Sequence, residues 1–346
     1  MIKSGVIARA EKYLQMNGTE TDLFSGVPKN PSIEDVLKGL VICRKFKPDV
    51  ILAIGGGSAM DCAKAILLFY EFPYLNFENV LEFNKKGEIP TERKTGLICV
   101  PSTSGTGSEV TRGTVITDPE KELKVPIMTD CLRPDLAILD PEITMTMPDH
   151  VAAETGMDAL THAIEAYTNH NLDDFDEGLC SSAIIGIMKW LPVSVFDKTL
   201  EAREKVHNYQ AMAGIGFANV GLGMVHGIAH SFGAAYNMAH GLTNAIILPY
   251  VLRYNSRDAV VREKLAELSY RCHCDDIITE IEKMREKLGI PASFREAGIT
   301  EEMYREKYDL LLEHAMLGAT NVNPVKMTMD EMKKMLNVVY TGNWEI

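Results

Sequence analysis

Residues 50–66 read VILAIGGGSAMDCAKAI, and this stretch decides the fold of the first half of the chain. Val50 to Ile54 is a short aliphatic run typical of a buried strand, and Ala59 to Phe69 has the spacing of a helix. Three glycines and Ser58 join the two, so no large side chain crowds the turn. Backbone N–H groups at the start of such a helix can approach an anion, which predicts a site for a dinucleotide pyrophosphate.

The glycine turn has a second interpretation, because it lacks the G-x-G-x-x-G spacing of the dinucleotide fingerprint and can serve packing alone. Asp61 and Lys64 lie in the first turns of the helix that follows it. An acid is favoured there by the helix dipole, and we expect Lys64 to be a solvated surface lysine.

Other short strands and helices surround this stretch. A helix is expected from Ile33, where Ser32 and Asp35 form a capping pattern. Short strands are expected at Leu97–Val100, Thr114–Thr117, Lys124–Met128 and Leu136–Leu139, and after Pro148 only helices, at 149–169, 174–197, 200–220, 241–254, 276–288 and 301–316. The sequence therefore predicts an α/β, Rossmann-like dinucleotide-binding domain over residues 1–146 and an all-α metal-binding domain over residues 147–346.

A second segment of small residues, PSTSGTGS at 101–108, also follows an expected strand. Eight consecutive residues without a large side chain are unusual, and their hydroxyls could line the ribose and phosphates of a nucleotide. A plain surface turn is the alternative.

Composition excludes several classes of partner. The 35 Lys and Arg and 48 Asp and Glu give a net charge of −13, which would repel nucleic acid and anionic lipid. Apolar stretches such as 245–252 are far shorter than the roughly 20 residues of a membrane span. We identify no export signal, and the seven cysteines are an odd number without framework spacing, so we expect a cytoplasmic protein.

The helical half contains a concentration of possible metal ligands. Asp158 and His162 are four residues apart in one expected helix, so their side chains share a face. His226, His230 and His240 fall within fifteen residues of mainly apolar and small sequence. Burying so many imidazoles would be costly, which favours a metal or a proton relay. One Asp and three His would suit iron or zinc. The Cys272–Cys274 triplet CHC has no second ligand cluster, and we do not expect it to be a site.

Five segments taken together resemble the iron-containing (group III) alcohol dehydrogenase family, and within it the lactaldehyde reductases, 1,3-propanediol dehydrogenases and butanol dehydrogenases. They are GGGSAMDCAKAI (55–66), PSTSGTGSEVT (101–111), DLAILDP (135–141), ETGMDALTHAIEAY (154–167) and GLGMVHGIAHSFGAAYNMAHG (221–241). The resemblance covers nearly the whole chain.

The resemblance implies a role for each matching position. The metal would be held by Asp158, His162, His226 and His240, and His230 would relay protons beside the substrate. The nucleotide would be bound in the first domain, with the active cleft between the two domains. The matching nucleotide positions are Asn30, Gly56, Gly57, Ser58, Asp61, Ser102, Thr103, Thr106, Thr111 and Lys124.

The chain departs from the family pattern at its start, where Met1–Gly5 leads directly into a helix. Family members usually have an earlier strand, whose last residue meets the adenosine ribose and separates NAD from NADP. Either the sequence is truncated or its start lies downstream of the family's usual one, and in the second case we expect an exposed sheet edge, poor solubility and weak cofactor binding. The choice between NAD and NADP stays open.

The function implied by the resemblance is metal-assisted hydride transfer between NAD or NADP and a small primary alcohol, diol or aldehyde. Fe²⁺ is favoured over Zn²⁺ by the resemblance alone, Phe217 and Asn219 are candidates to line the substrate site, and a homodimer is possible. A zinc-dependent, NAD-using lyase of the dehydroquinate-synthase sort and a metal-dependent hydrolase or hydratase are the alternative enzymes. A non-catalytic nucleotide-binding protein is a third alternative.

Overall fold

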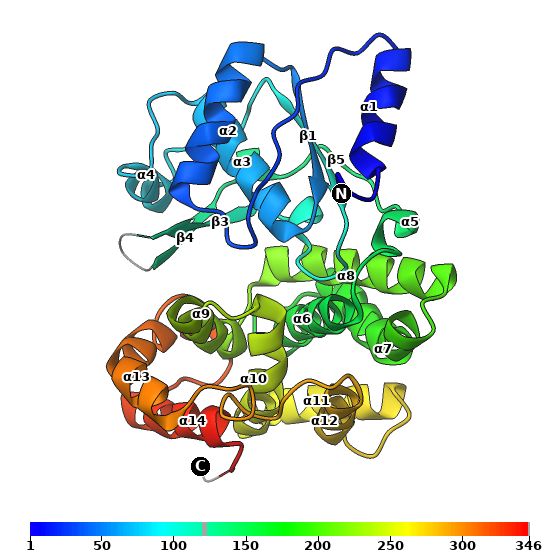
Figure 1. Ribbon diagram of the computed structural model, residues 1–346. Helices are drawn as coiled ribbons and strands as arrows, with labels where there is room; N and C mark the ends of the chain where they lie inside the picture. Colours follow the sequence, from blue (N-terminus) through cyan, green and yellow to red (C-terminus); the bar gives the residue numbers. More distant parts are fainter. Residues whose placement is uncertain (120–122, 345–346) are drawn as a thin grey trace. The chain divides into compact units, whose positions relative to one another are not determined.

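The computed structural model describes residues 1–119 and 123–344, and it divides into two compact units. Met1–Thr103 and Gly107–Met147 form the first unit, which contains the strands, and Ser104–Thr106 and Pro148–Ile346 form the second, which is helical (Figure 1). This confirms the expected combination of an α/β region and an all-α region. Three residues of the small-residue segment at 101–108 belong to the helical unit, which the residue pattern did not indicate.

The first unit is built on a parallel sheet of three strands in the order β1-β2-β5. β1 (Val50–Gly55) and β2 (Gly96–Pro101) pair along their whole length. β5 (Leu136–Ala137) is shorter than the expected strand, because regular pairing with β2 ends after Ala137. The outer side of β1 pairs with no other strand of the described residues, and Val50 is 45% exposed.

Two further strands form a separate antiparallel pair. β3 (Gly113–Asp118) pairs with β4 (Leu123–Met128), and both occur where strands were expected. A single bridge between Ser32 and Thr117 joins β3 to the residue that precedes α2.

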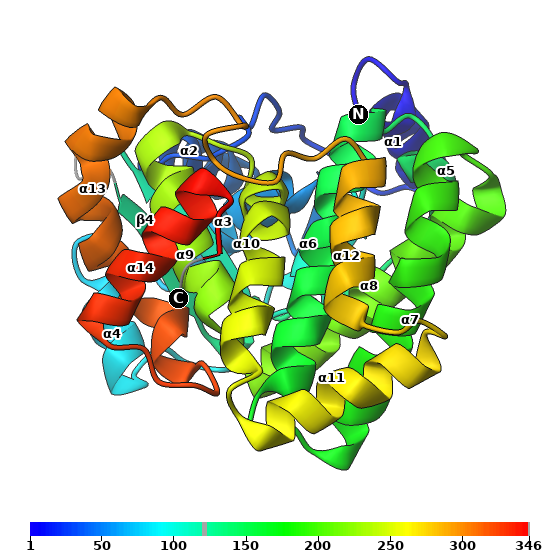
Figure 2. The ribbon, with the colours of Figure 1, turned by 90° about the horizontal axis from the view of Figure 1, so that it is seen from below.

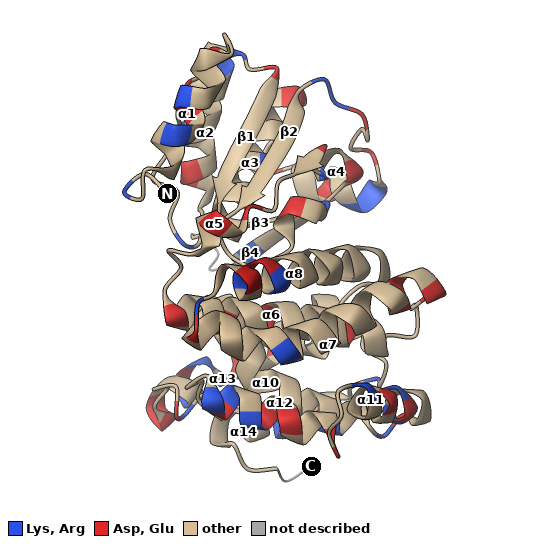
Figure 3. Ribbon diagram, turned by 90° about the vertical axis from the view of Figure 1, so that its right-hand side faces the viewer, with Lys and Arg blue, Asp and Glu red and all other residues tan. Residues whose placement is uncertain are grey.

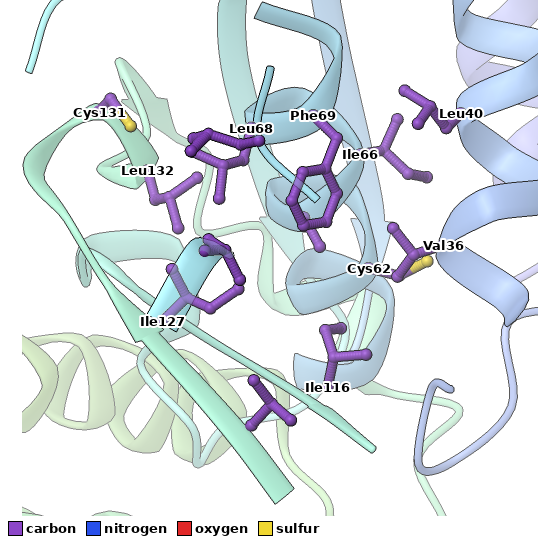
Figure 4. Close-up of a cluster of buried hydrophobic side chains, with 14 of the residues drawn as sticks. Val36, Leu40, Cys62, Ile66, Leu68, Phe69, Ile116, Ile127, Cys131 and Leu132 are labelled. Atoms are coloured by element: carbon purple, nitrogen blue, oxygen red, sulfur yellow. The ribbon is translucent and has the colours of Figure 1, made fainter. Parts of the chain in front are cut away.

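Helix α3 (Gly57–Glu71) is the centre of the first unit because both of its faces are buried. Met60 and Leu67 pack on the sheet, in a cluster with Ala53 of β1 and with Leu97 and Cys99 of β2. Cys62, Ile66 and Phe69 face the opposite way, toward α2 and the β3–β4 pair (Figure 4). The remaining helices of this unit are α1 (Val6–Met16), α2 (Ile33–Phe46), α4 (Val80–Lys86) and α5 (Pro141–Thr144).

The start of α2 confirms the capping pattern read from the sequence. The Ser32 hydroxyl accepts the backbone N–H of Asp35, and the Asp35 carboxylate accepts the backbone N–H of Ser32. This reciprocal pair satisfies two N–H groups that the first helical turn leaves without partners.

The second unit consists of helices, with α6 running beside α10 (Figure 2). Its α-helices are α6 (Asp149–Thr168), α7 (Asp174–Phe196), α8 (Leu200–Val220), α9 (Met224–Tyr236), α10 (His240–Asn255), α11 (Ala259–Arg271), α12 (Ile277–Lys287), α13 (Glu301–Ala315) and α14 (Met329–Thr341). The sequence analysis assigned no helix to α9, α11 or α14. In α9 the reason is physical, since Gly227 and Gly233 weaken the helix propensity and tertiary packing decides.

By length and composition alone, helix α7 could cross a membrane. This differs from the expectation that every apolar stretch of the sequence is too short for a membrane span. Half of its most apolar window is buried inside the protein, where Cys180, Ile184 and Ile187 are covered completely. A core helix of a globular unit passes the same test, and α7 packs extensively on α6 and α8.

Helix α14 supports a prediction about stability at low pH. The Glu331 carboxylate accepts the backbone N–H and the hydroxyl of Thr328 and an Arg257 N–H at 2.9 Å. These bonds, led by that backbone N–H, lower the pKa of Glu331 from 4.5 to about 2. The carboxylate therefore stabilises the fold above about pH 4.5, and this contribution is lost as the pH falls toward 2.

We expect Glu331→Ala to lower the free energy of unfolding by about 1 kcal/mol at pH 7, the usual cost of a lost helix cap. The difference from the wild type should shrink between pH 5 and about pH 2 in denaturant titrations. Asp330→Ala is the matched control, because Asp330 is 88% exposed and pairs with the neighbouring Lys333. A difference that is constant with pH would contradict this account.

Candidate metal centre and nucleotide-binding segments

The four expected metal ligands come together in the helical unit. Asp158 and His162 lie one turn apart on α6, His226 is in the first turn of α9, and His240 is the first residue of α10. One atom from each lies within 4.8 Å of the others. Asp158 Oδ1 is 3.9 Å from the Nε2 atoms of His162 and His226 and 3.7 Å from that of His240.

The backbone approaches needed for this cluster depend on glycines. A Cβ on Gly241 would collide with the backbone carbonyl of Glu154, so α10 meets α6 at close range. A Cβ on Gly227 would collide with the Thr320 side chain, which packs on α9. A larger residue at Gly241 would push α10 away from α6, and one at Gly227 would push the 318–322 segment away from α9.

Hydrogen bonds to the outer nitrogens orient two of the three imidazoles. His162 Nδ1 lies 3.2 Å from the carbonyl oxygen of Gly105, to which it can only donate. His226 Nδ1 bonds to Oε2 of Glu165. A hydrogen on each Nδ1 leaves the Nε2 lone pair facing the centre, which is the arrangement that metal-binding histidines require.

Glu165 also holds the start of α9, because the capping residue Gly223 has no side chain of its own. Its Oε1 accepts the backbone N–H of Val225 at 2.7 Å, and burial raises the pKa of Glu165 to about 8 despite these bonds. Asn323 accepts the N–H of Met224 beside it. Glu165 was not among the expected site residues, although it lies three residues after His162 on the same helix face.

Burial governs the protonation of the ligands. It raises the pKa of the Asp158 carboxyl, although His162 opposes this shift. It lowers the pKa of His162 and, more strongly, that of His226, where the neighbouring imidazoles add to the effect. Because a neutral imidazole offers a lone pair, the lowered pKa values keep His162 and His226 in the form that binds metal.

The residues present fit a divalent metal ion. Three imidazole nitrogens and one carboxylate oxygen converge. All four atoms are acceptors, and they repel one another unless a positive group lies between them. Tetrahedral coordination with bonds of about 2.1 Å places ligand atoms about 3.4 Å apart. The distances from Asp158 Oδ1, 3.7–3.9 Å, come close to that value. This donor set suits iron or zinc.

His230 and Phe217 border the cluster. His230 is exposed on α9, one turn after His226, and its ring stacks on that of His240 at 5.1 Å. The Phe217 ring stacks on His162 at 4.4 Å. Asn219, the other expected lining residue, instead donates to the Asp176 carboxylate at 3.0 Å.

The glycine turn has the expected local geometry. α3 begins at Gly57 after Gly56, and no side chain caps its first turn. The Ser58 hydroxyl donates to the Lys29 carbonyl at 2.5 Å, and Ser102 N–H donates to Gly55 at 2.8 Å. A Cβ on Gly56 would meet the Thr103 hydroxyl at 3.3 Å, so the two small-residue segments lie against each other.

The other expected nucleotide residues are more dispersed. Lys124 Nζ lies 3.3 Å from Asn30 Oδ1, so these two meet. Asp61 accepts the Ser108 hydroxyl at 2.9 Å and the Val115 N–H at 3.1 Å, which occupies both carboxylate oxygens inside the protein. Thr106 belongs to the helical unit.

The expectation that Lys64 is a surface lysine is wrong. The side chain is fully buried, and Nζ donates to the carbonyls of Ser108, Thr111 and Gly113 at 2.6, 2.9 and 2.9 Å. It also lies 3.4 Å from the Thr111 hydroxyl, another expected nucleotide residue. The Cys272–Cys274 triplet joins no metal-binding group among the described residues.

Comparisons with known proteins agree with this geometry. Residues 1–141 match the family model described as iron-containing alcohol dehydrogenase, and residues 152–340 match the C-terminal model of the Fe-containing alcohol dehydrogenase family. An NADPH-dependent butanol dehydrogenase of Clostridium saccharobutylicum is 39% identical over 99% of this chain and 89% of its own.

Solved structures are similar over almost the whole chain. An iron-containing alcohol dehydrogenase from Thermococcus thioreducens has a TM-score of 0.91 at 35% identity, over 99% of this chain and 91% of that one. A sulfoacetaldehyde reductase from Bifidobacterium kashiwanohense, in complex with NAD⁺, has a TM-score of 0.86 at 26% identity, over 99% and 89%. With its acceptor cluster, its glycine turn and these matches, the chain belongs to the iron-containing alcohol dehydrogenase family.

Proposed function

We propose that the protein is a metal-dependent, NAD(P)-linked alcohol dehydrogenase that interconverts small primary alcohols or diols with aldehydes. The observation that carries this proposal is the convergence of Asp158, His162, His226 and His240, four acceptors within 4.8 Å. The bound divalent cation supplies a Lewis acid that polarises the substrate oxygen. A nicotinamide cofactor would supply the hydride chemistry, and similar proteins are named as NADPH-dependent or as a complex with NAD⁺.

The protein's own residues divide the remaining tasks. Glu165 and the Gly105 carbonyl fix the orientation of His226 and His162. His230 is exposed next to His240, so it can exchange a proton with solvent and with the substrate oxygen. The stacked Phe217 ring covers one side of His162.

The nucleotide would bind at the first turn of α3, where Gly56, Gly57 and Ser58 leave the backbone accessible. Thr103 lies beside Gly56, and Asn30 and Lys124 form a second contact group. The main role of Asp61 is to hold the 108–115 segment in place, because both of its carboxylate oxygens accept hydrogen bonds from that segment. Ser102, Thr106 and Thr111 stay candidate contacts.

A lyase of the dehydroquinate-synthase sort fits less well. Such an enzyme has a polyanionic substrate and needs cationic side chains near its metal. Helices α6 and α9, which carry three of the four ligands, contain no Lys or Arg. The α10 helix has one arginine, Arg253 in its last turn. A small uncharged alcohol or aldehyde suits this surrounding better.

We further propose a cytoplasmic protein without nucleic acid partners. The net charge is −13, and charged residues of both signs are interspersed on the outer helices (Figure 3). All seven cysteines are free, and five are buried, which suits a reducing compartment. A homodimer is also proposed, and light scattering of the purified protein would test it by measuring the mass of the particle in solution.

The decisive experiment measures aldehyde-dependent oxidation of NADH and of NADPH by purified protein loaded separately with Fe²⁺ or Zn²⁺. We expect turnover with at least one cofactor, loss of turnover on chelation, and recovery with the metal. Binding of metal and cofactor without turnover on any carbonyl would favour a non-catalytic protein. Hydrolysis or dehydration without net cofactor oxidation would favour the hydrolase or lyase alternatives.

A further inference from the structure

Asn244 lies inside the metal centre although it is not among the four expected ligands. It is fully buried on α10, one turn after His240, so both side chains share a face of the helix. Its Nδ2 lies 2.6 Å from Asp158 Oδ1, 3.1 Å from His226 Nε2 and 3.2 Å from His240 Nε2. The amide therefore touches three of the four ligand atoms.

No single orientation of the Asn244 amide satisfies the hydrogen bonding of all the polar atoms involved. An NH₂ group has two hydrogens, so it can donate to only two of the three acceptors that it meets. Its Oδ1 is buried and has no hydrogen-bond partner among the described residues. A buried acceptor without a donor is costly, and native structures contain few of them.

A half-turn of the amide exchanges the two ends with little change in shape. The carbonyl oxygen then faces the same three acceptors, and only a cation among the ligand atoms makes that orientation favourable. In the first orientation the NH₂ group holds the ligand residues by hydrogen bonds. In the second, the carbonyl oxygen can coordinate the cation. Asn and Asp oxygens are both suitable metal donors, whereas alanine offers neither end.

We propose that Asn244 is a fifth member of the metal centre, which positions Asp158, His226 and His240 from α10 and turns its carbonyl oxygen toward the bound cation. This inference rests on the proposed metal site but adds a residue and a role to it. The close approach of Gly241 to the α6 backbone explains why a side chain from α10 reaches Asp158.

The test compares Asn244→Ala and Asn244→Asp for Zn²⁺ and Co²⁺ affinity, measured by chelator competition, together with the visible absorption of bound Co²⁺. We expect the alanine variant to bind metal about 10–100-fold more weakly, as for other residues that support metal ligands. The aspartate variant should recover at least tenfold of that loss, because it keeps an oxygen at the same place. Its metal-depleted form should unfold more easily than the wild type, because two carboxylates then meet.

Thr243→Val is the matched control, since Thr243 is equally buried on α10 and its hydroxyl bonds within the helix, to the His240 carbonyl. Wild-type affinity in Asn244→Ala would overturn the inference. So would an aspartate variant that binds metal no better than the alanine variant, or an unchanged Co²⁺ spectrum in both. If the wild type itself bound no stoichiometric divalent metal, the proposed function would fail instead.

Discussion

Replacing His226 by alanine is expected to abolish metal retention and alcohol oxidation together. The imidazole is 1% exposed, its Nε2 faces Asp158, and its Nδ1 bonds to Glu165. Alanine removes one of four donors and leaves the Glu165 carboxyl without its side-chain partner. We expect turnover to fall more than about a thousandfold, which corresponds to about 4 kcal/mol of lost transition-state stabilisation.

The measurement pairs metal content after dialysis with the rate of aldehyde reduction. His150→Ala is the control, because His150 is an exposed histidine on α6, the helix that carries Asp158 and His162. It should keep wild-type metal content and rate. Full activity in His226→Ala, or a wild-type rate that resists chelation, would refute the proposed role of the cluster.

The spacing of residues predicted the ligands of the helical unit better than their supports. Asp158 and His162 are four residues apart in a helix, so the sequence alone places them on one face. Spacing and composition made His226 and His240 candidates, but only the resemblance separated them from His230, because their meeting depends on how α9 and α10 pack on α6.

Glu165 and Asn244 were missed for the same physical reason. Each is an ordinary polar residue by type, and its importance comes from contacts across 61 and 86 residues of sequence. A weak local signal existed, since each follows a ligand by one helical turn. The glycines at 227 and 241 were a further signal, because glycine inside a helix is unfavourable unless a neighbour approaches closely.

The strands and the main helix of the α/β unit were predicted well. The reason is that β1 and α3 each contain a continuous run of apolar residues. The burial of Lys64 was not predicted, because a lysine in an apolar helix is by composition the natural solvent-facing residue. α3 is covered on both faces, by the sheet on one side and by α2, the β3–β4 pair and the 108–113 segment elsewhere, and this packing is not visible in the sequence.

Lys64→Met is expected to produce the largest loss of stability in the first unit. The ammonium group satisfies three backbone carbonyls and lies near Asp61, while burial lowers its pKa. Methionine fills a similar volume but leaves those carbonyls without a donor and Asp61 without its nearest positive charge. Breaking a buried charged arrangement in this way costs about 3–5 kcal/mol.

Lys38→Met separates this effect from the mere loss of a positive charge. Lys38 is 59% exposed on α2 and pairs with Glu34 one turn away, so its replacement should leave stability almost unchanged. In denaturant titrations the first unit of Lys64→Met should unfold at a clearly lower concentration than that of Lys38→Met. Because Nζ holds the segment from Ser108 to Gly113, cofactor affinity should fall as well, even where the variant is still folded. Equal midpoints for the two variants would mean that the three carbonyls find other donors, and that Lys64 does not organise this segment.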